Sequence, residues 1–226
     1  MSAVRTPARP EAPPAAGDPY AHLSAGERYI HRTRDQALLA LLARHGFGRL
    51  AGQSIIELGC GEGSLLRTLL HYGADRRLLV GVDLDPRQAR RARSALPGVS
   101  TLAGDAGALP LTGGAFDFAF AFTSFSSMLD DETRRRAAHE AMRALRPGGL
   151  LVVYDFTLNP FNRTVRPLRA AELRALFAPR DVEIERVTLA PPIARALRGN
   201  EAWCAPLERL TALRTHLLAA VRKEDA

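Results

Sequence analysis

The chain has 226 residues, is 46% hydrophobic and 24% charged, and carries a formal charge of +7. This length and composition are ordinary for one globular domain that buries its own core. No run of about 18 apolar residues is present, which excludes a helix that spans a membrane. Residues 1–18 are rich in proline and alanine, so we expect a disordered leader there and a single domain over residues 19–226.

The basic residues indicate which kinds of partner to expect, and the two cysteines indicate whether to expect disulfides or a metal site. Lys223 is the only lysine among 31 basic residues, and the arginines are spread along the chain with no tract longer than residues 134–136. We therefore expect solvated arginines, or a basic surface that faces an anionic substrate or membrane headgroups, and no nucleic-acid partner. Cys60 and Cys204 have no paired spacing, which predicts free thiols in a reducing cytoplasm and no metal site.

Apolar periodicity and turn residues predict helices that alternate with strands. The predicted helices cover residues 23–45, 64–72, 86–96, 130–145, 170–177 and a segment over 191–213, broken near residues 199–200 and Pro206. The predicted strands cover residues 53–58, 78–83, 99–102, 116–122, 150–156, 182–189 and 215–222. This order predicts an α/β fold with a mostly parallel sheet and helices on both faces. Ligands of such folds bind at the carboxyl ends of the strands, where the strand order reverses.

A glycine-rich loop follows the first predicted strand and opens a helix. The loop reads Gly59-Cys60-Gly61-Glu62-Gly63, and its glycines allow a tight turn and a close backbone approach to a ligand. Ser64 stands where a dinucleotide fingerprint has Gly or Ala, and no lysine follows as in a phosphate-binding P-loop. Glu57 suits a ligand with an ammonium group, which favours S-adenosylmethionine (SAM) over NAD.

From about Ala37 to Lys223 the sequence resembles the class I SAM-dependent methyltransferases. The resemblance implies a Rossmann-like, doubly wound, seven-stranded sheet with an antiparallel last strand. It also implies N-terminal covering helices over residues 19–46 and a helical cap over residues 190–213, which could alternatively form a dimer face. In this family the glycine loop approaches the methionine part of SAM, with Glu57 at the acidic position of the motif.

The resemblance also implies the contacts of the nucleoside. Asp83 would accept hydrogen bonds from both ribose hydroxyls, with Asp85 as the alternative acid, and Leu84 would lie beside the adenine. Asp105 would accept from the adenine amino group, although an Asx-turn is the alternative for this residue. The expected cofactor-binding residues are Glu57, Gly59, Cys60, Gly61, Gly63, Asp83, Leu84, Gly104, Asp105, Ala106, Phe122 and Thr123. The implied product of the cofactor is S-adenosylhomocysteine.

Candidates for the acceptor side follow from their places in the predicted fold. Asp155 ends the fifth strand and His31 lies in the N-terminal cover, so each is a candidate general base for a hydroxyl acceptor. The alternatives are an acid that bonds the loop and a surface histidine. Arg163 and Arg166 could clamp an anionic acceptor or lie solvated on the loop. Further substrate candidates are Tyr20, Tyr29, Tyr154 and Asn159.

The resemblance implies transfer of a methyl group from SAM to a small-molecule acceptor. We expect O-methylation of a hydroxyl on a sugar-like, lipid-linked or secondary-metabolite substrate. The alternatives are an RNA or protein methyltransferase and a regulatory module that binds SAM without catalysis. After the fourth strand, residues 123–126 read Thr-Ser-Phe-Ser rather than an Asn-Pro-Pro-Tyr-type motif, which argues against nucleic acid. A monomer, a homodimer and a peripheral membrane contact all remain open.

Overall fold

The computed structural model describes residues 23–158 and 164–224. Its helices are α1 (Ala25–Arg44), α2 (Ser64–His71), α3 (Pro86–Ala95), α4 (Asp131–Ala144), α5 (Ala170–Phe177), α6 (Pro191–Ala196) and α7 (Glu201–Glu208). Its strands are β1 (Ile55–Leu58), β2 (Leu79–Asp83), β3 (Ser100–Ala103), β4 (Phe116–Phe122), β5 (Leu145–Phe156), β6 (Val182–Leu189) and β7 (Arg214–Arg222). The leader predicted over residues 1–18 lies outside the described residues. Within the described part, no helix is both long and apolar enough to cross a bilayer.

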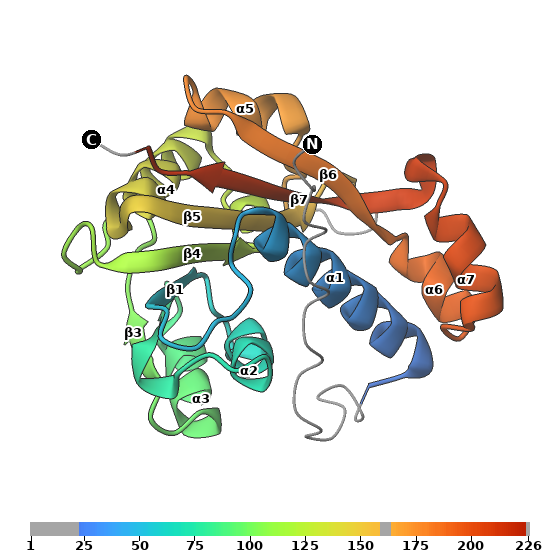
Figure 1. Ribbon diagram of the computed structural model, residues 1–226, viewed down its shortest axis with the longest axis horizontal. Coiled ribbons are helices and arrows are strands. Elements are labelled where there is room, and N and C mark those ends of the chain that lie inside the picture. The colour runs from blue at the N-terminus through green and yellow to red at the C-terminus, as the bar shows by residue number, and fades with distance from the viewer. Residues whose placement is uncertain (1–22, 159–163, 225–226) are drawn as a thin grey trace, which may run out of the picture.

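The seven strands form one sheet in the order β3-β2-β1-β4-β5-β7-β6 (Figure 1). Strands β1 to β5 pair in parallel, and β7 runs antiparallel to both β5 and β6. This topology confirms the predicted Rossmann-like fold and its antiparallel last strand. The chain order reverses between β1 and β4, so the carboxyl ends of these two strands border the crevice where ligands of such folds bind.

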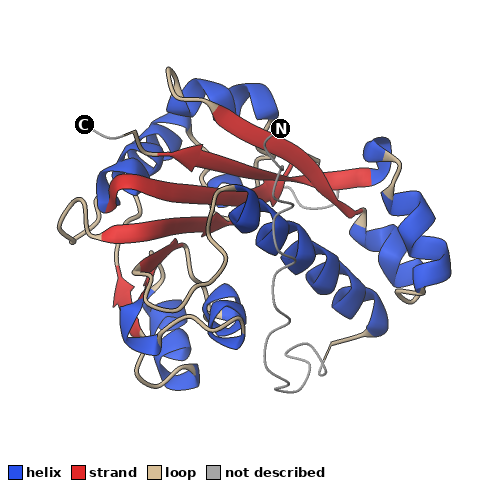
Figure 2. Ribbon diagram, viewed as in Figure 1, coloured by secondary structure: helices blue, strands red, loops and turns tan. Residues whose placement is uncertain are grey.

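Helices cover both faces of the sheet (Figure 2). Successive residues of β4 point to opposite faces, as the two-residue period of a strand requires. Phe118 and Phe120 pack in the core shared with α1, α2 and α3. Ala119 and Ala121 pack in the core shared with α4 and α5. Burial on both faces explains why residues 118–122 of β4 read as a continuous apolar run instead of an alternating one.

Helix α1 begins at a capping box and extends from the sheet toward α6 and α7 (Figure 1). The Ser24 hydroxyl accepts from the Glu27 N–H, while the Glu27 carboxylate accepts from the Ser24 N–H, which satisfies the free donors of the first turn. Gly26 permits the close approach of α6, because a Cβ there would lie 2.7 Å from the Arg195 Cα. The N-terminal helix and the α6–α7 segment therefore form one connected layer at the crevice.

Most predicted boundaries lie within two residues of the observed ones, and two features of the prediction differ more. β5 begins at Leu145 rather than at Leu150, because the intervening turn stays hydrogen-bonded to the end of β7. There the Gly148 N–H donates to the Lys223 carbonyl at 2.9 Å, and the Lys223 N–H donates to the Gly149 carbonyl at 2.8 Å. The predicted break at Pro206 is wrong, since Pro206 lies inside α7. The predicted break near residues 199–200 is confirmed, because Asn200 caps α7.

Candidate cofactor and acceptor site

The glycine loop turns sharply between β1 and α2. Gly59 has a φ of +72°, and a Cβ at this position would lie 2.5 Å from the Ser124 Oγ. Ser124 cannot easily move away, because its hydroxyl donates to the Leu58 carbonyl. A residue with a side chain at Gly59 would therefore meet both backbone strain and a steric clash. The loop brings its backbone N–H groups to the carboxyl end of the sheet, where they can face a ligand.

Asp83 ties the end of β2 to this loop. One carboxylate oxygen accepts from the Gly61 N–H at 2.7 Å, and the other accepts from the Asp85 N–H at 2.9 Å. These two bonds fix the orientation of the carboxylate. A carboxylate offers about four lone-pair directions, so Asp83 can still accept hydrogen bonds from a ligand.

Asp83 lies in a hollow of 430 Å³, which we call the β2-side cavity. Its lining includes Asp83, Leu84, Gly104, Asp105 and Ala106. The backbone of this segment is held to β2, because the Gly104 N–H donates to the Asp83 carbonyl at 2.9 Å. Leu84 is 74% exposed, which leaves an apolar side chain free to cover a flat ring at the mouth of the cavity. The cavity thus combines a carboxylate for hydroxyl groups with an apolar edge for a base.

A second hollow of 440 Å³, the β5-side cavity, lies on the other side of the glycine loop. Its lining includes His31 and Arg34 from α1, Glu57, Cys60, Tyr154, Phe156 and His216. Gly59, Gly61, Phe122 and Thr123 line both cavities. Thr123 has a φ of +53°, a strained value for a β-branched residue, and it lies where the two cavities meet. The two cavities therefore form one crevice at the switch point of the sheet.

Glu57 is a buried carboxylate in this crevice. It is 3% exposed, and its Oε2 atom has no hydrogen-bond partner within the described part of the chain. Burial raises the pKa of Glu57 well above its usual value, while the nearby Arg34 opposes the rise and Asp83 adds to it. An ammonium group would give the orphan oxygen a donor and would favour the charged carboxylate.

Arg34 supplies a buried positive charge to the same cavity. It is 8% exposed, and its Nε and Nη2 atoms donate to one Asp35 oxygen at 2.9 and 2.8 Å. The guanidinium carbon lies 5.7 Å from the centre of the Phe122 ring and 5.9 Å from the centre of the Tyr154 ring. Arg34 was not predicted from the sequence. The signal that could have found it is an Arg-Asp pair on the core-facing side of an amphipathic helix.

Four rings form an aromatic wall in the β5-side cavity. Tyr154 lies 5.2 Å from Phe122 and stacks on His216 at 4.8 Å with an interplanar angle of 8°. Phe156 continues the wall at 4.6 Å from His216. Burial lowers the pKa of His216 to about 3, and Arg34 adds to this effect. Burial raises the pKa of Tyr154 to about 12, so both polar rings are uncharged near neutral pH.

Comparisons with known proteins agree with this geometry. Residues 55–149 match the family described as "Methyltransferase domain". A probable S-adenosylmethionine-dependent methyltransferase of Mycolicibacterium smegmatis is 31% identical over 194 residues, which cover 79% of this chain and 68% of the relative. The chain belongs to the SAM-dependent methyltransferases. SAM is therefore the cofactor of this methyltransferase, and S-adenosylhomocysteine is the product formed from it.

Other relatives of the methyltransferase act on quinone-type molecules, as their names state. A demethylmenaquinone methyltransferase of Renibacterium salmoninarum is 31% identical over 52% of this chain and 48% of its own length. A 2-methyl-6-phytyl-1,4-hydroquinone methyltransferase of Synechocystis is 32% identical over 46% of this chain and 32% of its own length. The matches thus span half or less of these two relatives.

Solved structures of SAM-dependent methyltransferases share the fold. One from Thermotoga maritima has a TM-score of 0.62 at 22% identity and covers 88% of this chain and 92% of its own. Another from Mesorhizobium loti has a TM-score of 0.58 at 21% identity, with 84% and 99% of the two chains covered.

The crevice of the methyltransferase fits SAM in its residue types. Glu57, with its orphan oxygen, would hold the ammonium group, and Arg34 would hold the carboxylate of the methionine part. Asp83 would hold the ribose, and the segment at Asp105 would hold the adenine. Asp105 also forms the alternative Asx-type turn, because its carboxylate accepts from the Gly107 N–H at 2.8 Å. Its second oxygen is 3.5 Å from an Arg136 nitrogen.

Two residues predicted as candidates on the acceptor side, His31 and Tyr154, line the β5-side cavity. Asp155 does not line the crevice. It is fully buried, and its carboxylate accepts from the Ser126 N–H at 2.9 Å and the Phe156 N–H at 2.8 Å. Burial raises the pKa of Asp155 to about 6, and these hydrogen bonds oppose the rise. The geometry favours the predicted alternative, an acid that fixes the backbone after β4 and β5.

Two further predicted candidates, Tyr29 and Arg166, are not brought to the crevice. The Tyr29 hydroxyl donates to the Glu208 carboxylate at 2.6 Å, in a hollow between α1 and α7. Arg166 pairs with Asp131 and Glu172 beside α4 and α5. Tyr20, Asn159 and Arg163 lie outside the described residues.

Proposed function

We propose that this methyltransferase transfers the methyl group of SAM to a hydroxyl oxygen of a small molecule that carries a flat, mostly apolar ring. The observation that carries the proposal is the aromatic wall of Phe122, Tyr154, Phe156 and His216 in the β5-side cavity. Aromatic side chains favour offset or edge contacts with a ring. This cavity of 440 Å³ would hold the ring beside the methionine part of SAM, and its volume is in the range of small-molecule pockets.

The protein residues bind and orient the two substrates. When bound, SAM supplies an activated methyl group on a positively charged sulfur. Thr123 lines both cavities, and its backbone has a positive φ. Its place at their junction is where the acceptor oxygen would approach the methyl group of SAM. His31 is the cavity histidine that remains a candidate base for the hydroxyl proton. His216 is a poor base at neutral pH, because burial lowers its pKa to about 3.

A second candidate reaction is methylation of a ring carbon on a hydroxylated aromatic acceptor. The names of two relatives, a demethylmenaquinone methyltransferase and a 2-methyl-6-phytyl-1,4-hydroquinone methyltransferase, favour this reaction. Both candidates need the same kind of acceptor, a ring that bears a hydroxyl group. They differ only in the atom that receives the methyl group.

The full-length protein should be incubated with SAM and separate panels of hydroquinones and catechols, saccharides, hydroxylated lipids, RNA and protein. Formation of S-adenosylhomocysteine measures turnover, and NMR of the product identifies the methylated atom. We expect turnover with hydroxylated aromatics and an O-methyl product. A C-methyl product would select the second candidate. Turnover only with saccharides, RNA or protein would contradict the proposal.

A matched pair of variants tests the aromatic wall itself. Phe156→Ala shortens the wall, and we expect a KM for the aromatic acceptor about tenfold higher, as lost ring contacts of 1–1.5 kcal/mol would give. Phe47→Ala removes a similarly half-buried ring that packs on Phe118, away from the crevice, and should leave this KM unchanged. Equal KM values for the two variants would show that the wall does not bind the acceptor.

A further inference from the structure

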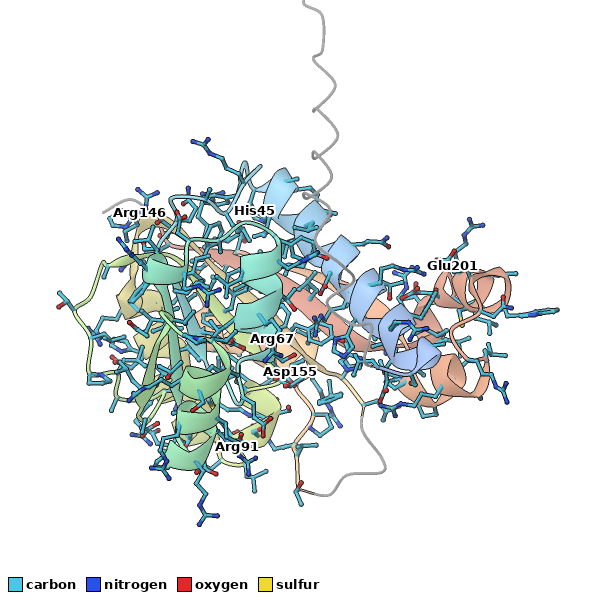
Figure 3. The ribbon with its side chains drawn as sticks, turned by 90° about the horizontal axis from the view of Figure 1, so that it is seen from below. His45, Arg67, Arg91, Arg146, Asp155 and Glu201 are labelled. Carbon is cyan, nitrogen blue, oxygen red and sulfur yellow. The ribbon has the colours of Figure 1, made fainter. Side chains whose placement is uncertain are left out.

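A basic groove lies between α2 and α3, on the outer side of the glycine loop. Arg67 of α2 and Arg87, Arg90 and Arg91 of α3 line a hollow of 850 Å³ together with Glu62. Figure 3 labels Arg67 and Arg91, which project from the two neighbouring helices. Four positive side chains and one negative side chain thus face the same concave surface.

The sequence of α3 places its arginines on this surface. Ala89 and Ala92 are the buried residues of the helix, and Ala92 packs in the core beside Leu96. Small residues on the buried face let α3 lie close to the sheet, while the long side chains take the opposite face. The helix carries no acidic residue that could neutralise them, since its sequence is PRQARRARSA.

Most of the positive charge of the groove is not paired. The Arg91 Nη1 lies 2.6 Å from the Glu62 carboxylate, which is the one carboxylate in the lining. Arg67, Arg87 and Arg90 make no side-chain hydrogen bond or ion pair within residues 23–158 and 164–224. Unpaired like charges on one concave surface repel each other, and an anion bound among them would remove this repulsion.

We propose that this groove binds a small ligand that carries at least two phosphate groups. Guanidinium groups bind phosphate oxygens through paired, charge-assisted hydrogen bonds, and arginines from two helices can hold more than one phosphate. The lining also includes Ser64 and Ser94, whose hydroxyls can donate to phosphate oxygens. Among the described residues of the lining, Ala95 is the only apolar one, so the surface suits a polar ligand rather than a lipid chain.

The groove is separate from the crevice but adjoins it. Glu62 and Ser64 line both the groove and the β5-side cavity, while the other lining residues of the groove do not face the crevice. A ligand in the groove would therefore leave the expected contacts of the cofactor intact. The proposal goes beyond methyl transfer and does not depend on the identity of the acceptor.

Calorimetric titration of the full-length protein with inorganic pyrophosphate at low salt tests the proposal. The titration is made with and without saturating S-adenosylhomocysteine. Pyrophosphate that binds in the crevice would be displaced by this product, whereas pyrophosphate in the groove would still bind. We expect saturable binding in both conditions. The triple variant Arg67→Gln, Arg87→Gln and Arg90→Gln should bind pyrophosphate at least about tenfold more weakly, because each arginine contributes charge-assisted hydrogen bonds.

A control variant removes the same amount of charge elsewhere. Arg49, Arg174 and Arg198 are exposed and also lack a side-chain partner within the described ranges, so their triple change to Gln lowers the net charge equally. This control should bind pyrophosphate like the wild type, and both triple variants should keep the wild-type affinity for S-adenosylhomocysteine. If S-adenosylhomocysteine does not bind to the wild-type protein, that result contradicts the assignment of the cofactor site and leaves the proposal for the groove unaffected.

Three results would overturn the proposal. The first is no saturable binding of pyrophosphate to the wild-type protein, and the second is equal weakening in the two triple variants. The third is groove-dependent binding of an RNA oligonucleotide or of vesicles rich in phosphatidylglycerol, without binding of pyrophosphate. That result would assign the arginines to a macromolecular or membrane surface instead.

Discussion

Replacement of Asp83 by alanine tests the arrangement of the cofactor site. The Asp83 carboxylate lines the β2-side cavity and already accepts from the Gly61 and Asp85 N–H groups. Its remaining lone pairs are the acceptors that we assign to the ribose hydroxyls. The alanine variant removes these acceptors and also frees the glycine loop from β2, so both the affinity for cofactor and the order of the loop should fall.

The expected loss can be worked from the hydrogen bonds involved. A hydrogen bond to a charged group contributes about 1.5–3 kcal/mol, so loss of the ribose contacts should weaken binding of S-adenosylhomocysteine by about 10- to 150-fold. The two backbone donors left without Asp83 should lower the free energy of unfolding by about 1–3 kcal/mol. Asp83→Asn keeps one acceptor oxygen and should fall between the alanine variant and the wild type.

Asp85→Ala is a matched control, because it removes the same charge two residues away in the same cavity. The Asp85 carboxylate caps α3 by accepting from the Arg87 N–H at 2.8 Å, so its loss should cost about 1 kcal/mol of stability. Calorimetry with S-adenosylhomocysteine measures affinity, and thermal unfolding without ligand measures stability. If Asp83→Ala binds the product as tightly as Asp85→Ala, the assignment of the ribose to Asp83 is wrong.

Two further changes test the loop and the aromatic wall. Gly59→Ala should abolish measurable binding of S-adenosylhomocysteine, because a Cβ there meets the Ser124 Oγ at 2.5 Å and φ is +72°; near-normal affinity by calorimetry would contradict the close approach. Burial lowers the pKa of folded His216 to about 3 from 6.5, so only the unfolded chain takes up this proton as the pH falls below about 6.5. His216 should therefore lower the free energy of unfolding between pH 6.5 and 3, by an amount on the order of 4 kcal/mol, and His216→Phe should remove that part of the pH dependence in urea unfolding. Parallel pH profiles for the two proteins would show that His216 titrates normally.

The central strands could be predicted because each is short, continuous and apolar between clear turn residues. β4, in the middle of the sheet, was predicted with its observed bounds, and so was the edge strand β6, which was predicted from its alternating pattern. The boundaries that failed depend on partners distant in sequence. Residues 145–149 read as the end of a helix and a turn, but the backbone groups of this segment bond to β4 and to the end of β7. A short stretch of sequence cannot reveal the bonds to β7, because this strand lies about 70 residues later along the chain.

The cofactor half of the crevice was predictable for a similar reason. The glycine loop and Asp83 come from β1 and β2 and the turns that directly follow them, and neighbouring parallel strands bring their carboxyl ends to one edge. The resemblance to the class I SAM-dependent methyltransferases assigned roles to Glu57, Asp83 and Asp105, and their places at strand ends explain why they line two adjoining cavities. The structure adds Arg34, which opposes the rise in the pKa of Glu57.

The half of the crevice that we propose for the acceptor draws its residues from elements that are not neighbours in sequence. His216 faces the crevice because β7 inserts between β5 and β6 and runs antiparallel, which sets His216 opposite Phe156. From the sequence alone, a histidine at the start of the last strand is more consistent with packing or capping than with a ligand site. Asp155 shows the converse, since its alternation with Tyr154 and Phe156 turns it to the other face of the sheet, toward Ser126. The face of β5 on which a residue lies, more than its chemical type, therefore decides which polar side chains can meet the acceptor.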